Sequence, residues 1–405
     1  MDGYCNCMVL QKFILPLNKE SMRRYVFILL VLVSQACHPA VSNNPVEKGD
    51  KDYLVSAEAK GSSTADELKK TYGLLSTNIK NGYTSYRITY NTTDEDGKAI
   101  IASGAIFVPD TKDAVPLLNY DHGTIFPAQE KNAPSYLGNG FELNIGKLFS
   151  AAGYLVVLPD YTGYGTTKDE LHPYGAYPVI ATTVVDMLRA TKEFCHENNI
   201  TLSGKNFFSG WSEGAAVAMA TVKTLEEDHP GEFTPTAAVL NAGPYYTSKF
   251  ADYVLETKEP LRYMRTYVWI LQSYNRVFDI NRPLTYYFKE PFASELKEGE
   301  QSDIPKDPQE LFTNKFIKDY KSGKDTALRN AMLRNDLWNW KPKAKIVLCH
   351  GDKDEYVPLF NSEKAYNTMK AKGADVSLEI FKGATHGSGV FSFMQQAFGT
   401  FEKER

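Results

Sequence analysis

The sequence contains few residues of the types that carry metal or disulfide chemistry. Of its 405 residues, only 5 are cysteine and 7 are histidine. No group of these residues has the spacing of a metal site, so we expect neither a metal nor a cofactor. Cys195 and Cys349 lie at the end of a predicted helix and in a predicted strand, and we expect both to be buried free thiols.

The chain also has no large excess of charge of either sign. Its 45 Lys and Arg residues and 49 Asp and Glu residues give a net charge of −4. Nucleic-acid-binding proteins usually carry a basic face, so this balance argues against a nucleic-acid partner. With 43% apolar residues, the chain is long enough for a large core and fits one α/β domain with an insertion.

The apolar stretch near the N-terminus is too short to cross a membrane. It covers residues 25–33, whereas a spanning helix needs about 20 apolar residues. It follows Met22-Arg23-Arg24 and precedes Ser34-Gln35-Ala36-Cys37, an order that is typical of an export signal. The last four residues resemble the cleavage box of a bacterial lipoprotein, in which the cysteine becomes lipidated.

We therefore interpret residues 1–40 as a leader, with translation starting at Met22 and residues 1–21 preceding the natural start. The resemblance implies an exported protein that lipid on Cys37 anchors to a bacterial envelope membrane, since each buried methylene contributes about 0.8 kcal/mol. The alternative is an ordinary secretory signal and a soluble, secreted or periplasmic protein. Residues 41–65 are rich in polar and small residues, which predicts a flexible tether.

A Gly-x-Ser-x-Gly motif occurs at residues 210–214. A β-like run, residues 206–209, precedes it, and an alanine-rich stretch typical of a helix, residues 215–220, follows it. A serine on a sharp strand-to-helix turn has its hydroxyl exposed above the sheet. Glycines on both sides avoid collisions with the neighbouring chain. These features predict Ser212 as a nucleophile.

A serine hydroxyl needs a base in hydrogen-bond reach, and the base needs an orienting acid. Two predicted strands towards the C-terminus end beside suitable residues. Residues 345–350 form a compact apolar run that ends just before Asp352 and Asp354, and residues 375–381 alternate and precede His386. The Gly-x-x-Asp-x-x-Val-Pro frame of residues 351–358 resembles the acid loop of the α/β-hydrolases. This resemblance implies Asp354 as the acid, with Asp352 as the alternative, and His386 as the base.

These motifs together resemble the α/β-hydrolase superfamily, whose triad follows the chain order Ser, Asp, His. A Tyr-x-His-Gly-Thr loop at residues 120–124 and a Pro-Asp-Tyr-x-Gly-x-Gly segment at residues 159–165 further resemble its secretory-lipase-like branch. The resemblance covers about residues 80–403. It implies an α/β fold with a mostly parallel central sheet flanked by helices, and a serine esterase or lipase activity.

The resemblance also implies an oxyanion hole. Its first donor is the backbone N–H of Glu213, and its second is that of Gly123 or Thr124, in the loop after an earlier strand. His122 beside this loop has the alternative role of bracing it. Asp160 precedes the nucleophile in the chain, so we assign it to loop structure.

About a hundred residues separate the strand that ends near residue 241 from the strand that begins at residue 345. This is too long for a simple connection, and its apolar residues recur at helical spacing. We predict a helical cap over the catalytic face at residues 244–340 and a core formed by residues 66–243 and 341–405.

The expected function is cleavage of carboxylic esters through an acyl-enzyme intermediate, with a small-molecule ester as substrate. One alternative is a serine aminopeptidase-like amide hydrolase of the same fold. Another is a non-catalytic lipid- or carbohydrate-binding lipoprotein, because a fold alone does not give a function. The ordered set of Ser, Asp and His favours an enzyme, whereas oligomeric state and substrate group remain open.

Overall fold

The computed structural model describes residues 52–300 and 303–405. The predictions for the leader, for Cys37 and for residues 41–51 of the tether lie outside this part of the chain. Within it, no helix combines the length and the apolar character that a membrane span requires.

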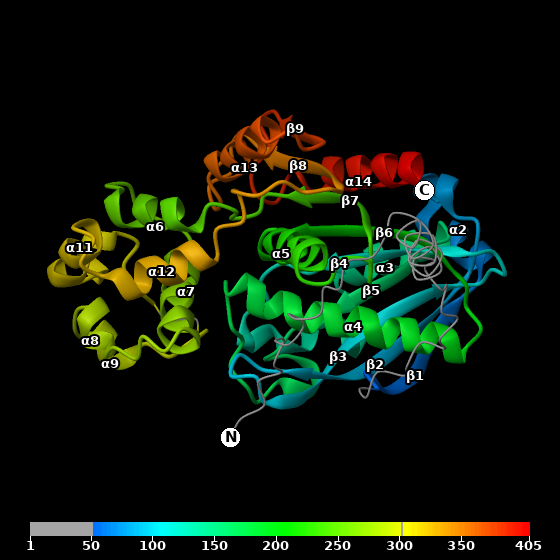
Figure 1. Cartoon of the computed structure of the whole chain (residues 1–405), viewed down its shortest axis with the longest axis horizontal. Coiled ribbons are helices and arrows are strands. Elements are labelled where there is room, and N and C mark those ends of the chain that lie inside the picture. The colour runs from blue at the N-terminus through cyan, green and yellow to red at the C-terminus, as the bar shows by residue number, and fades with distance from the viewer. Residues whose placement is uncertain (1–51, 301–302) are drawn as a thin grey trace, which may run out of the picture. The chain divides into compact units, whose positions relative to one another are not determined.

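A nine-stranded sheet forms the centre of the described chain (Figure 1). Its strands, in spatial order, are β1 (Leu54–Ser63), β2 (Tyr83–Thr93), β3 (Ala99–Pro109), β5 (Leu155–Pro159), β4 (Val115–Asp121), β6 (Leu202–Trp211), β7 (Pro235–Asn241), β8 (Lys345–Gly351) and β9 (Val376–Phe381). The pairs β1–β2, β2–β3 and β3–β5 are antiparallel, and the remaining pairs are parallel. The predicted mostly parallel sheet is confirmed.

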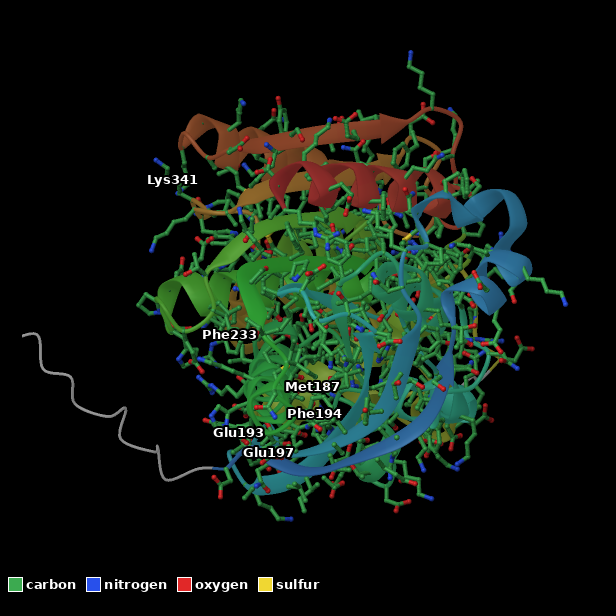
Figure 2. All side chains as sticks on the ribbon, turned by 90° about the vertical axis from the view of Figure 1, so that its right-hand side faces the viewer. Met187, Glu193, Phe194, Glu197, Phe233 and Lys341 are labelled. Atoms are coloured by element: carbon green, nitrogen blue, oxygen red, sulfur yellow. The ribbon has the colours of Figure 1, made fainter. Side chains whose placement is uncertain are left out.

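Strand β1 corrects the prediction of a flexible tether that extends to residue 65. Its residues pair along β2, and almost all of its side chains are exposed, as expected of an edge strand. Glu193 of α4 (Tyr177–Glu197) accepts hydrogen bonds from the backbone N–H groups of Tyr53 and Leu54 and so fixes the start of the strand. Figure 2 labels Glu193. The core therefore begins before residue 66. Pairing with residues that are distant in the sequence holds this polar segment in a strand.

Helices cover both faces of the sheet because the side chains of its inner strands are buried on both sides. In β5, Leu155 and Val157 face one apolar cluster, whereas Val156 and Leu158 face another. The first cluster includes residues of α4, α5 (Glu213–Glu227) and α13 (Phe360–Ala371). The second includes residues of α2 (Ala65–Tyr72), α3 (Phe141–Ala151) and α14 (Val390–Glu404).

The connection between β7 and β8 is helical and has an apolar core of its own. Its helices are α6 (Thr247–Glu256), α7 (Met264–Val277), α8 (Leu284–Tyr287), α9 (Phe292–Glu295), α10 (Pro308–Leu311), α11 (Asn314–Lys321) and α12 (Thr326–Arg334). We call α6–α12 the cap segment. In Figure 1 it lies to the left of the sheet.

Two hydrogen bonds and one ring contact join the cap segment to the carboxyl ends of the strands. Tyr267 donates to the backbone oxygen of Tyr356, in the loop after β8. Tyr274 donates to the backbone oxygen of Gly175, in the connection after β5. Trp269 stacks on Phe126, in the loop after β4, with ring centroids 5.7 Å apart. The cap segment therefore adjoins the edge of the sheet at which α/β proteins usually bind ligands.

Candidate active site

Ser212 lies on the turn between β6 and α5 with φ 60° and ψ −122°. A non-glycine residue in such a conformation costs about 1–3 kcal/mol and is typical of functional sites. The flanking glycines permit close approach: a Cβ atom on Gly214 would lie 2.0 Å from the backbone oxygen of Asp121, and one on Gly210 would lie 2.3 Å from that of Gly214. The predicted strand–turn–helix context of the serine is present.

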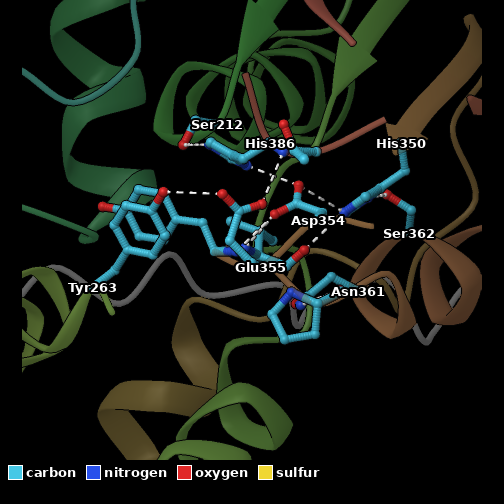
Figure 3. A network of polar contacts seen from close by, with 12 residues as sticks. Ser212, Tyr263, His350, Asp354, Glu355, Asn361, Ser362 and His386 are labelled. Atoms are coloured by element: carbon cyan, nitrogen blue, oxygen red, sulfur yellow. Dashed lines mark hydrogen bonds and ion pairs between the residues drawn. The ribbon is translucent and has the colours of Figure 1, made fainter. Parts of the chain in front are cut away.

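The fold brings the three predicted triad residues together (Figure 3). Nε2 of His386 lies 2.9 Å from Oγ of Ser212, and Nδ1 of His386 lies 2.8 Å from Oδ2 of Asp354. A carboxylate only accepts hydrogen bonds, so Nδ1 of His386 donates and Nε2 is left to accept the serine proton. This arrangement matches a nucleophile, base and orienting acid.

Asp354 is held by more than His386. Its Oδ1 accepts hydrogen bonds from the backbone N–H groups of Tyr356 and Val357. Its Oδ2 lies 3.3 Å from Nε2 of His350, whose Nδ1 lies 2.7 Å from Oγ of Ser362. Burial acts to raise the pKa of the Asp354 carboxyl, but the hydrogen bonds to the two histidines outweigh it and hold that pKa well below its usual range.

Asp352, the alternative acid, has a different environment. Its side chain is exposed, and its Oδ1 accepts a hydrogen bond from the backbone N–H of Gly383. This contact joins the loop after β8 to the loop after β9, as expected of a turn residue.

The predicted oxyanion residues adjoin the serine turn. A Cβ atom on Gly123 would lie 3.3 Å from the backbone oxygen of Trp211 and 3.9 Å from Cβ of Ser212. Thr124 is hydrogen-bonded through Oγ1 to the hydroxyl of Tyr174 at 2.9 Å. Glu213 begins α5, so its backbone N–H has no acceptor within the helix.

His122 braces the loop that carries Gly123. Its Nδ1 lies 2.7 Å from the backbone oxygen of Gly123, and its Nε2 lies 3.0 Å from the backbone oxygen of Asp160. The Asp160 carboxylate in turn accepts hydrogen bonds from the hydroxyl of Ser103 and the backbone N–H of Ser135. Both residues are buried and connect loops, which is the role that the chain order predicted for Asp160.

The comparisons with known proteins identify the family of the chain. Residues 140–388 match a family described as serine aminopeptidase S33. The chain belongs to this family. It is therefore a hydrolase of the α/β-hydrolase type. None of the curated proteins compared with it matches significantly.

Solved structures similar to this S33 family member show the same fold. A putative hydrolase from Legionella pneumophila is 24% identical with a TM-score of 0.78, and the match covers 87% of this chain and 98% of that one. The rice cell wall degrading esterase LipA from Xanthomonas oryzae is 23% identical with a TM-score of 0.75, covering 88% and 100% of the two chains. Candida antarctica lipase A is 15% identical with a TM-score of 0.63, covering 87% and 83%.

Sequence reasoning missed two histidines at the site of this S33 hydrolase. His350 is the next-to-last residue of β8, directly before Gly351, so its place beside the acid loop was a usable signal. His172 lies in the connection between β5 and α4, and its Nε2 is 2.9 Å from Oε1 of Glu213. Nothing in its local sequence indicates this contact, because the two residues are 41 positions apart.

The cap segment also contacts the loop of the acid. Tyr263 donates a hydrogen bond to Oε1 of Glu355, and Oε2 of Glu355 accepts one from the backbone N–H of His386 (Figure 3). The ring of Tyr263 stacks on Tyr356, with centroids 3.8 Å apart and planes 7° apart, and Tyr356 lies 4.8 Å from the His386 ring. The position of the base is thus linked to the first turn of α7.

An apolar pocket lies within the cap segment. It is lined by Tyr177, Pro244, Thr247, Phe250, Ala251, Val254, Leu255, Tyr267, Ile270, Leu271, Phe312, Phe316, Tyr320, Leu328 and Met332. Ser212, Asp354 and His386 are not among its lining residues. Tyr267 connects it to the acid loop through the hydrogen bond to Tyr356. Among the described residues, no cluster of His, Cys, Asp or Glu could hold a metal ion.

Proposed function

We propose that the protein hydrolyses carboxylic esters through an acyl-enzyme intermediate. The observation that carries this proposal is the continuous hydrogen-bonded path from Ser212 through His386 to Asp354. Each atom in the path has the donor or acceptor that nucleophilic catalysis needs. The strained turn under Ser212 further supports a functional serine.

In the proposed reaction, Oγ of Ser212 attacks the ester carbonyl carbon while Nε2 of His386 takes the serine proton. Asp354 holds the imidazole ring and stabilises its cationic form. The backbone N–H groups of Glu213 and of Gly123 or Thr124 bind the oxyanion. His386 then protonates the leaving alcohol, and water, activated by the same histidine, releases the acid and restores Ser212.

The alternative is an aminopeptidase-like amide hydrolase, which the description of the family favours. Recognition of a free substrate amine needs an available carboxylate near the serine. Glu213 is paired with His172, and Glu355 is bound by Tyr263 and lies 3.8 Å from Arg262. These pairings favour an ester over a charged amino-terminal substrate.

A fluorophosphonate probe followed by peptide mass spectrometry tests the nucleophile. We expect covalent labelling at Ser212 and none in Ser212→Ala. A folded wild-type protein that is not labelled would support the third reading, a non-catalytic lipid- or carbohydrate-binding protein. Rates on p-nitrophenyl esters of increasing chain length, measured beside aminoacyl p-nitroanilides, then separate esterase, lipase and peptidase. Turnover of the anilides alone would contradict the ester proposal.

We further propose that the protein is exported and lipid-anchored through Cys37. The order of basic, apolar and cysteine-containing segments in residues 22–37 supports this. In a bacterial host, the wild type should incorporate labelled palmitate and sediment with membranes, whereas Cys37→Ser should do neither. Equal membrane association of the two proteins would contradict the anchor and favour plain secretion.

A further inference from the structure

A buried pair of ionisable side chains adjoins Ser212 but takes no part in the proposed triad. Nε2 of His172 lies 2.9 Å from Oε1 of Glu213, and the two side chains are only 1% and 2% exposed. Glu213 follows the proposed nucleophile directly, and its backbone N–H is a proposed oxyanion donor. The pair therefore lies beside the point at which negative charge develops in the reaction.

The hydrogen bonds of His172 fix the proton content of this pair. Nδ1 of His172 lies 2.7 Å from the backbone oxygen of Thr162. A carbonyl oxygen only accepts, so Nδ1 carries a hydrogen. Nε2 and the Glu213 carboxyl then share one further proton, which gives either an imidazolium with a carboxylate or two neutral groups. In both states the pair has no net charge.

Glu213 has no other polar partner among the described residues. Its Oε2 is buried and makes no hydrogen bond there, so His172 is the side chain that holds the carboxyl group. Removing one member of a buried ion pair leaves an uncompensated group, which typically costs more than the pair contributes. A bare carboxylate at this position would also oppose the charge that forms on the substrate oxygen.

The fold holds His172 firmly in place. Gly163 has a φ of 95°, and a Cβ atom there would lie 2.7 Å from atoms of His172, so only glycine permits the close approach. The imidazole ring lies 4.9 Å from the ring of Tyr164. The backbone oxygen of His172 accepts a hydrogen bond from Arg276 of α7 at 3.2 Å.

We propose that His172 is a positioning residue of the oxyanion hole. It holds the side chain of Glu213 and balances its charge, so that the first N–H of α5 stays directed at the substrate oxyanion in a site without excess negative charge. This role rests on the proposed ester hydrolysis and assigns a function to a histidine outside the triad.

The test compares the wild type with His172→Gln and with the double variant His172→Gln/Glu213→Gln. Kinetics with a p-nitrophenyl ester give kcat and KM, and circular dichroism checks the fold of each protein. Loss of a whole oxyanion donor lowers kcat about 10²–10³-fold. Glutamine keeps an N–H donor for the Glu213 carboxyl group but cannot take up a proton and balance its charge. We therefore expect His172→Gln to lower kcat at least about tenfold within that limit, with KM nearly unchanged. The double variant should recover most of kcat, because it contains no unpaired carboxyl group. A merely structural histidine would not be rescued by a change in Glu213.

Glu226→Gln serves as the matched control. Glu226 is a buried glutamate of the same helix, and its carboxylate accepts hydrogen bonds from the backbone N–H groups of Lys343 and Ala344, away from the serine turn. Its substitution should leave kcat unchanged. If His172→Gln does not fold, the double variant still tests the role of His172. It should fold and keep kcat within about tenfold of the wild type.

The failure of this inference differs from the failure of the proposed function. An active wild type with an equally active His172→Gln, or a loss that the second substitution does not restore, overturns the role of His172 alone. A wild type that neither cleaves esters nor reacts with a fluorophosphonate overturns the proposed function and this inference with it.

Discussion

Nε2 of His350 lies 3.3 Å from Oδ2 of Asp354, the same oxygen that receives the hydrogen bond of His386. The acid of the candidate triad therefore lies between two histidines. His350 is fully buried and is itself fixed by Ser362 and by the backbone oxygen of Val357. Asp354 thus links this second histidine to the candidate base.

The first prediction concerns His350. His350→Leu should lower kcat about tenfold and destabilise the fold by about 1–3 kcal/mol, because buried acceptors lose their donor. His350→Gln is the matched control, since its amide N–H can still donate near Asp354 and Val357, and it should keep most of kcat. Steady-state kinetics and urea unfolding measure both effects. An equal loss of kcat in the two variants would contradict a role for the N–H donor of His350.

The second prediction concerns the Asp354 carboxyl, whose folded-state pKa lies below its usual range. A lowered folded-state pKa contributes stability that is fully present above the unfolded pKa of about 3.9 and is lost as the pH falls towards the folded value. Between pH 7 and pH 3, this group alone should cost the wild type about 1 kcal/mol. Asp354→Asn should lack that part of the pH dependence in urea unfolding. If the unfolding free energies of the two proteins changed in parallel with pH, the lowered pKa of Asp354 would be contradicted.

The same substitution tests the triad. Asp354→Asn should lower kcat by up to about 10⁴-fold with little change in KM, because the imidazole loses the partner that sets its tautomer. Asp352→Asn is the control and should retain activity, since Asp352 contacts Gly383 and not His386. The reverse result would make Asp352 the acid.

The third prediction concerns the link between the cap segment and the base. Tyr263→Ala removes the stacking on Tyr356 and the hydrogen bond to Glu355, which in turn contacts the backbone of His386. We expect kcat/KM to fall about tenfold, because small displacements of a base lower its efficiency. Tyr253→Ala changes an exposed tyrosine of α6 and should have little effect. Ester kinetics of the two variants measure the difference.

The fourth prediction concerns the glycines of the serine turn. Gly214→Ala should prevent formation of an active, soluble protein, because its Cβ atom would lie 2.0 Å from the backbone oxygen of Asp121. Gly399→Ala is the control in an exposed position of α14, where a Cβ atom meets nothing within 4 Å. It should stabilise the protein by about 0.5–1 kcal/mol, since alanine favours a helix. Thermal unfolding and soluble yield distinguish the outcomes.

The elements that position the site could be predicted because each has a strong local signal. The apolar run before Gly351 was predicted to be a strand. It forms β8, in which nearly all side chains are buried. The hairpin between β2 and β3 closes at a turn that contains Gly97, whose φ of 77° favours glycine. The glycines around Ser212 likewise indicate a close approach of backbone segments, which the structure contains.

Strand β1 and the role of His172 could not be predicted in the same way. The residues of β1 are polar, and their order depends on pairing with β2 and on the carboxylate of Glu193. His172 precedes a proline, which favours an ordinary loop histidine. The proposed role of His172 depends on its contact with Glu213, and this contact exists only in the folded protein.

The sequence by itself determined the order of strands and helices, the turn that presents Ser212 and the residue types that surround it, because periodicity, glycine positions and turn chemistry act over a few neighbouring residues. Only the tertiary structure decided which histidines pair with Asp354 and Glu213 and how the cap segment contacts the acid loop. Such contacts join side chains that are distant along the chain. Their distances depend on the packing of the whole sheet with its helices, which no local pattern contains.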